Sequence, residues 1–156
     1  MLFSGCAALR ETAERALASG ADGIDLGFGF DATEDDVVRC FSELADLDCV
    51  LSVDTLSPAL IRAALFRADL IFSLTAETLP LLADEVKKAG AAAVIIPRDG
   101  AGLTESVDAA RAAGLEMIFA DPLLQPPLSG MTESLAGFLP EFGAPMSSTT
   151  LTRWKI

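Results

Sequence analysis

Five short apolar segments of the sequence carry or end at residues whose side chains could bind a ligand. The segments are residues 23–26, 50–53, 70–74, 93–96 and 117–120. We consider five of these side chains as candidates, namely three carboxylates, one hydroxyl and one guanidinium: Asp25, Asp54, Asp121, Ser73 and Arg98. A carboxylate can accept two hydrogen bonds side by side, and a guanidinium can hold an anionic group through its planar fork. We therefore expect a binding site for a small polar molecule.

The pattern of the chain places these side chains at one edge of a sheet. The apolar segments alternate with predicted helices over residues 4–19, 33–44, 57–67, 77–89, 104–114 and 129–138. Short apolar strands alternating with helices are typical of a parallel sheet with right-handed crossovers. In such α/β folds, ligands bind at the carboxyl ends of the strands. Strand starts recur every 20 to 26 residues, which favours a β/α barrel, although periodicity alone leaves an open sheet possible.

Each candidate residue also has a purely structural interpretation. An aspartate after a strand can cap a helix or open a turn. This alternative suits Asp54 poorly, because Ser57 is a better cap, and it suits Asp121 poorly, because no helix is expected until about residue 129. Arg98 could instead pair with Asp99 or Asp121. Three phenylalanines could either stack on a flat heterocycle or belong to the core: Phe28, Phe30 and Phe72.

The composition excludes several classes of function. The 156 residues carry a formal net charge of −12, which would repel a nucleic acid. Histidine is absent, so a Ser-His-Asp triad and His-ligated zinc are excluded. The three cysteines lack C-x-x-C spacing, which favours reduced thiols in a cytoplasmic protein. No apolar run approaches the roughly 20 residues of a membrane span, so we expect no membrane partner.

Four short motifs resemble those of dihydropteroate synthases. Residues 20–27, Gly-Ala-Asp-Gly-Ile-Asp-Leu-Gly, are similar to the "GADIIDIG" phrase of that family, and Val53-Asp54-Thr55 is similar to its "SVDT" motif. Residues 68–71 and Ala120-Asp121-Pro122 resemble the "GADIIND" and "DPG" phrases that follow. Residues 120–129 are also similar to a segment of the archaeal dihydropteroate synthase-related proteins. The resemblance covers about residues 10–140.

This resemblance implies a (β/α)₈ barrel that binds a pterin at its strand ends. The chain would form a partial barrel domain over residues 1–145, with strands matching roughly the second to sixth, and an irregular tail over 146–156. Asp54 and Asp121 would hold the ring, with Asp25 nearby. Ser73 would offer a hydroxyl where the synthases have asparagine, and Arg98 would be available for an anionic group. Synthases of this family join a pterin pyrophosphate to an aminobenzoate-type amine in folate or methanopterin biosynthesis, and Mg²⁺ is possible by resemblance.

The sequence also departs from the family pattern. Lysine occurs at Lys87, Lys88 and Lys155, none of them at an expected strand end, and the family's lysine-bearing strand end has no counterpart. We therefore expect weak or no synthase activity from this chain alone. Three alternatives remain open. The chain could be a non-catalytic subunit that completes a barrel as a homo-oligomer or with a second chain, a domain of the pterin-dependent methyltransferase type, or an α/β enzyme for a small phosphorylated or carboxylated substrate.

Overall fold

The computed structural model describes residues 6–97 and 102–123. Several residues named above lie outside this part of the chain: Arg98, residues 124–129 of the segment that resembles the archaeal proteins, the predicted helix 129–138 and the predicted tail 146–156.

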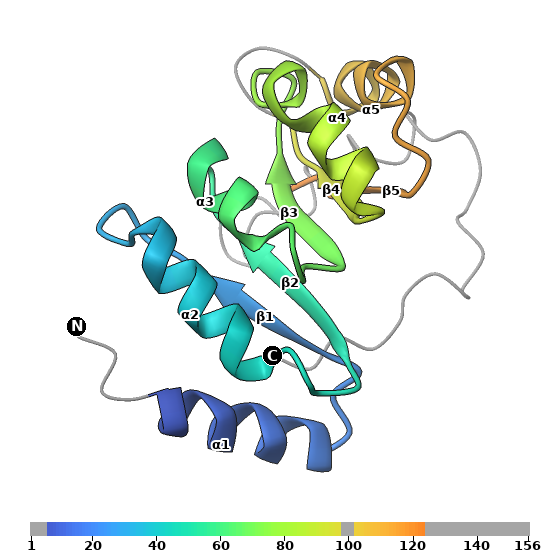
Figure 1. Cartoon of the computed structure of the whole chain (residues 1–156). Helices are drawn as coiled ribbons and strands as arrows, with labels where there is room; N and C mark the ends of the chain where they lie inside the picture. The colour runs from blue at the N-terminus through green and yellow to red at the C-terminus, as the bar shows by residue number, and fades with distance from the viewer. Residues whose placement is uncertain (1–5, 98–101, 124–156) are drawn as a thin grey trace, which may run out of the picture.

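Five helices alternate with five parallel strands along the described chain (Figure 1). The order is α1 (Cys6–Ala18), β1 (Gly23–Gly27), α2 (Glu34–Leu44), β2 (Val50–Asp54), α3 (Pro58–Ala64), β3 (Leu70–Leu74), α4 (Leu79–Ala89), β4 (Ala92–Ile95), α5 (Leu103–Ala112) and β5 (Ile118–Ala120). The strands lie in the sheet in sequence order, β1-β2-β3-β4-β5, and every neighbouring pair is parallel. This order confirms the predicted β/α repeat and is that of an arc of a β/α barrel.

Local signals in the sequence fix where the helices begin and end. At the start of α2 the Thr33 side chain accepts a hydrogen bond from the Asp36 backbone, and the Asp36 side chain accepts one from the Thr33 backbone, which forms a complete capping box. The repeated glycine that follows α1, α4 and α5 adopts a left-handed conformation, with φ of 92° at Gly20, 71° at Gly90 and 85° at Gly114. Glycine adopts this conformation without steric cost, so these three glycines mark helix ends.

The two faces of the sheet differ in what covers them. Alternate strand residues, among them Leu51, Val53, Ile71 and Ile95, are fully buried in the main core against the helices. Since successive side chains in a strand point to opposite faces, the intervening residues lie on the face turned away from α1–α5, here called the inner face. Figure 1 shows the helices arrayed along one side of the sheet. The inner face therefore carries two of the residues predicted to bind a ligand, Asp25 and Asp54, together with a small apolar cluster at Leu70, Ala92 and Val94.

The structure shortens two predicted helices. The helix that begins at Pro58 was expected to reach about Arg67, but α3 ends at Ala64. Arg67 instead belongs to the following turn, where its guanidinium donates to the carbonyl oxygens of Ala45, Leu47 and Cys49. The helix predicted from Glu77 begins at Leu79, after a turn closed by mutual Thr75 and Thr78 hydrogen bonds. In both places, side-chain hydrogen bonds to the backbone compete with the helix.

Two expectations drawn from composition can be compared with the described residues. Cys40 is buried and Cys49 is half-buried, and neither forms a disulfide within the described part of the chain. Within residues 6–97 and 102–123, every helix is too short or too polar to cross a membrane.

Candidate functional site

Two carboxylates lie on neighbouring strands of the inner face, and each is held by a serine of the next strand. The Ser52 hydroxyl on β2 donates to Oδ1 of Asp25 on β1, with 2.5 Å between the oxygens. The Ser73 hydroxyl at the end of β3 donates to Oδ1 of Asp54 on β2, with 2.7 Å between the oxygens. The structure therefore brings together three of the predicted site residues, Asp25, Asp54 and Ser73. Ser52 completes the cluster, which we call the Asp/Ser cluster.

The strand register explains why these residues meet. Asp25 is paired with Ser52, and Gly27 is paired with Asp54, so the two carboxylates lie diagonally across the β1–β2 pair on one face. Polar side chains at positions 52 and 54 share that face because they are two residues apart, whereas Leu51 and Val53 face the helices. The alternation of apolar and polar residues along β2 thus builds half of the cluster.

The surroundings of Asp25 shift the pKa of its carboxyl group. Desolvation raises the pKa of its carboxyl above the ordinary value, and the nearby charge of Asp54 acts in the same direction. Hydrogen bonds from the Ser52 hydroxyl and the Leu26 backbone partly oppose this rise. The ion pairs formed among the described residues join other side chains and do not include Asp25, Asp54 or Asp121. The cluster is thus an acidic, acceptor-rich surface.

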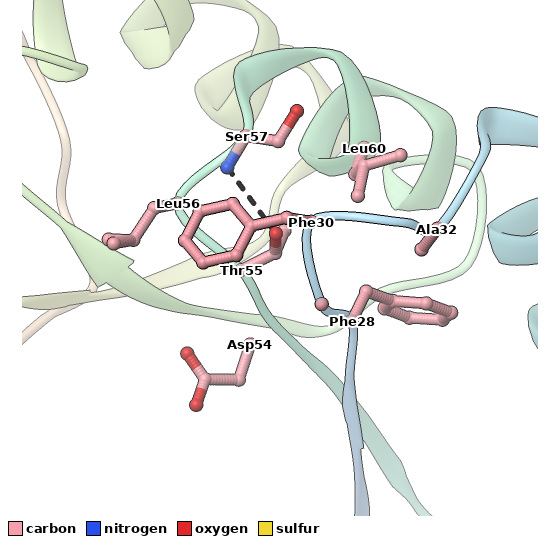
Figure 2. A pocket seen from close by; sticks show the side chains of 9 residues that line it. Phe28, Phe30, Ala32, Asp54, Thr55, Leu56, Ser57 and Leu60 are labelled. Atoms are coloured by element: carbon pink, nitrogen blue, oxygen red, sulfur yellow. Dashed lines mark hydrogen bonds between the residues drawn. The ribbon is translucent and has the colours of Figure 1, made fainter. Parts of the chain in front are cut away.

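A pocket of about 410 Å³ lies beside Asp54, between the loop after β1 and the loop after β2. Its lining combines one carboxylate and two hydroxyl residues with apolar side chains: Phe28, Gly29, Phe30, Ala32, Asp54, Thr55, Leu56, Ser57 and Leu60. Figure 2 shows Phe30 and Leu56 on the loop side of the pocket and the Asp54 carboxylate on the strand side. Phe30 is fully exposed to solvent, which is unusual for a side chain of its size. Asp54 connects this pocket with the Asp/Ser cluster.

The remaining predicted site residues lie elsewhere. Asp121 follows β5 at the same edge of the sheet, and its backbone N–H continues the ladder to the Ile95 carbonyl at 2.9 Å. Its carboxylate accepts a hydrogen bond from the Leu123 backbone at 2.8 Å, which is the turn-forming role that we considered as its structural alternative. Asp121 does not line the pocket beside Asp54. The predicted role of Arg98 concerns a residue outside the described part of the chain.

The aromatic candidates divide between core and pocket. The Phe28 ring stacks on Phe41 with 6.4 Å between their centroids, and Phe72 packs on the small inner-face cluster. These two therefore have the core role that we gave as the alternative, although Phe28 also lines the pocket. Phe30 makes no such packing contact and is free to meet a ligand at the pocket mouth.

Sequence reasoning missed several residues of the site. Ser52 was treated only as part of a strand, although a serine between Leu51 and Val53 and two residues before Asp54 already indicates a polar inner face. Leu56 and Leu60 line the pocket, and no sequence signal distinguished them from ordinary loop or helix residues. Thr55 also lines it, and the sequence singled this residue out only as part of the motif around Asp54. Ser57 was predicted to cap α3, but its side chain makes no capping hydrogen bond.

Metal ligation has little support in the described residues. Nowhere in residues 6–97 and 102–123 do three acidic, cysteine or histidine side chains gather closely enough to hold a metal ion.

The chain is similar to known proteins in sequence and in fold. No protein-family model matches the chain. An uncharacterized protein of Methanocaldococcus jannaschii is 35% identical over 126 residues, which cover 70% of this chain and 24% of that protein. The chain thus spans about a quarter of the length of this relative.

Solved structures with a similar fold include two dihydropteroate synthases. The 7,8-dihydropteroate synthase of Vibrio fischeri ES114 superposes with a TM-score of 0.71 at 20% identity, covering 92% of this chain and 67% of that one. The dihydropteroate synthase of Xanthomonas albilineans, solved with 4-aminobenzoic acid, gives a TM-score of 0.65 at 24% identity, covering 83% of this chain and 56% of that one. These likenesses establish a shared fold over part of the synthase barrel.

Proposed function

Because the chain has a dihydropteroate synthase-like fold, we propose that it is a pterin-binding domain related to folate or methanopterin biosynthesis. The observation that carries the proposal is the position of Asp54. It lies in the motif that resembles the family's "SVDT" phrase, it sits at the carboxyl end of β2, and its carboxylate lines the pocket described above. Ligands of parallel α/β folds bind at this edge of the sheet.

The pocket offers complementary contacts for a flat, amino-substituted heterocycle. A pterin ring presents an N–H/NH₂ edge, and the Asp54 carboxylate can accept both hydrogen bonds as a pair. The exposed Phe30 ring at the pocket mouth would cover part of the heterocycle's face. A volume of about 410 Å³ falls within the usual range of small-molecule pockets.

Other residues would support this binding mode. We propose that Asp121 contributes from the far side of the inner face, with Asp25 acting on the charge of the site rather than touching the ring. Arg98 would serve an anionic group of the ligand. The solved relative that holds 4-aminobenzoic acid supports an aminobenzoate-type amine as the second ligand. We propose weak or no condensation of the two by this chain alone.

Calorimetric titration with a reduced pterin tests the proposal. The wild-type chain is compared with Asp54→Asn and Asp121→Asn, which keep the shape of the side chain but replace an acceptor by an amide. Removing a charged hydrogen-bond acceptor from the ring edge is expected to weaken binding about tenfold or more for Asp54→Asn. Absence of binding at millimolar pterin, or affinity indifferent to both substitutions, would overturn it.

A further inference from the structure

Ser73 has an unusual backbone for a strand residue. Its φ of 64° lies in the left-handed region, which residues other than glycine, asparagine and aspartate rarely adopt. The pairing of β3 with β4 shifts between Ile71 and Leu74, so Ser73 stands at an irregularity in the sheet. Such a conformation is strained for a residue with a side chain and persists where the surrounding structure compensates for it.

This irregularity decides where the Ser73 side chain points. The register partner of Asp54 on β3 is Phe72, which lies on the inner face with Leu70 and Val94. In a regular strand the residue after Phe72 would face the helices. Ser73 instead directs its hydroxyl to Oδ1 of Asp54 at 2.7 Å. The left-handed residue therefore places a second β3 side chain beside the Asp54 carboxylate.

We propose that Ser73 is a positioning residue that sets the ligand preference of Asp54, an inference that rests on the proposed pterin site. The hydroxyl hydrogen of Ser73 is committed to Asp54 Oδ1, so the pair can only accept hydrogen bonds from a ligand. The bond also holds the carboxylate in one orientation relative to the pocket. A heterocycle with two adjacent N–H donors satisfies this arrangement. A carbonyl oxygen at the same edge would face a carboxylate oxygen, and the two acceptors would repel each other.

Two matched heterocycles separate these cases. Pterin carries a 2-amino group beside its N3–H, whereas lumazine carries a 2-oxo group at the same position. We expect the wild-type chain to bind pterin at least tenfold more tightly than lumazine, as calorimetric titration of each would show. In Ser73→Ala the carboxylate is no longer held, so pterin affinity should fall about tenfold while lumazine affinity changes little.

A second variant separates positioning from a change in the backbone. Asparagine tolerates the left-handed conformation and its amide can donate to Asp54, so Ser73→Asn should restore most of the preference for pterin. Ser106→Ala is the matched control, because it removes a serine hydroxyl from α5, whose main contacts are with β4, β5 and α4. It should leave the pterin-to-lumazine ratio as in the wild type.

Crystal structures of the unliganded wild-type chain and of Ser73→Ala make the test independent of pterin binding. One Asp54 conformer in the wild type and several in Ser73→Ala support the positioning role, even if no pterin binds and the proposed function fails. The same single Asp54 conformer in both proteins overturns the inference. An unchanged pterin-to-lumazine ratio in a folded Ser73→Ala chain that binds pterin overturns it as well.

Discussion

The hydroxyl of Ser73 on β3 lies 2.7 Å from the Asp54 carboxylate on β2 and donates a hydrogen bond to it. The same relationship recurs one strand earlier, where Ser52 donates to Asp25. Among the described residues, Asp25 and Asp54 are therefore each held by a serine hydroxyl and not by a cationic side chain. This arrangement preserves acceptor capacity at the strand ends, as binding of an N–H-rich ligand requires.

Asp25→Asn is expected to stabilise the chain at neutral pH. Burial raises the pKa of Asp25 in the folded state, so its ionised form is disfavoured there relative to the unfolded chain. Ionisation of Asp25 therefore lowers the free energy of unfolding at neutral pH. This loss of stability is absent at low pH and develops as the pH rises from the ordinary pKa of 3.8 through the raised pKa of the folded state. Above that pKa the loss stays constant. Because the side chain is partly exposed, we expect a gain of at most about 1 kcal/mol.

Urea unfolding of wild type and Asp25→Asn at pH 7 and pH 4 measures this effect. The difference in free energy of unfolding should be larger at pH 7 than at pH 4. The asparagine carbonyl can still accept from Ser52, so the variant keeps that hydrogen bond. A variant that is less stable than the wild type at pH 7 would show that the carboxylate is not desolvated as described.

Phe30→Ala is expected to weaken ligand binding without changing stability. The ring is fully exposed and lines the pocket, so its removal takes away a ligand contact but no core contact. We expect reduced-pterin affinity to fall roughly three- to tenfold and the free energy of unfolding to change by less than about 0.5 kcal/mol. Thermal unfolding and calorimetric titration measure the two quantities. Unaltered affinity would exclude Phe30 from the site.

Arg67→Ala is expected to lower stability without changing ligand binding. Its guanidinium donates to three carbonyl groups and to Asp69 at the amino end of the sheet, away from the Asp/Ser cluster. Losing this set of charged hydrogen bonds should lower the free energy of unfolding by about 2 kcal/mol. Pterin affinity, measured at a temperature where the variant is folded, should stay within about twofold of the wild type. A selective loss of affinity would contradict the placement of the site at the carboxyl ends.

Ser106→Ala is expected to stabilise the chain. The Ser106 hydroxyl is fully buried in α5 and has no hydrogen-bond partner among the described residues. A buried hydroxyl without a partner is destabilising, and alanine also has the higher helix propensity. We expect a gain of about 1 kcal/mol in the free energy of unfolding, measured by urea denaturation. A loss of stability would indicate that the hydroxyl has a partner.

The sequence predicted the order and type of the elements because local signals coincide with the global repeat. Thr33 caps α2 where the predicted helix begins, and Gly20, Gly90 and Gly114 follow helices close to their predicted ends. The predicted parallel order of the strands is confirmed. Helix ends such as that of α3 were wrong by a few residues, because Arg67 is held by carbonyl groups of a loop about twenty positions earlier in the chain. A contact between residues so far apart in the sequence does not change the local spacing of apolar residues, so that spacing could not predict it.

The site was predictable only in part for a similar reason. Strand-end chemistry identified Asp25, Asp54 and Ser73, which the structure brings into one cluster. The left-handed backbone at Ser73 was not predicted, since it arises from the shifted pairing of β3 with β4 and not from a residue type that favours it. The hydrogen bond that the Asp121 carboxylate accepts from the Leu123 backbone was likewise not predicted, because only the distance to the next predicted helix was considered.

A crystal structure of the chain with bound reduced pterin tests the central claim most directly. The proposal predicts the amino edge of the ring within hydrogen-bonding distance, roughly 2.7–3.1 Å, of the Asp54 carboxylate. The face of the heterocycle should lie against Phe30. A pterin bound away from Asp54, or a pocket that stays empty at saturating pterin while the protein remains folded, would contradict the claim.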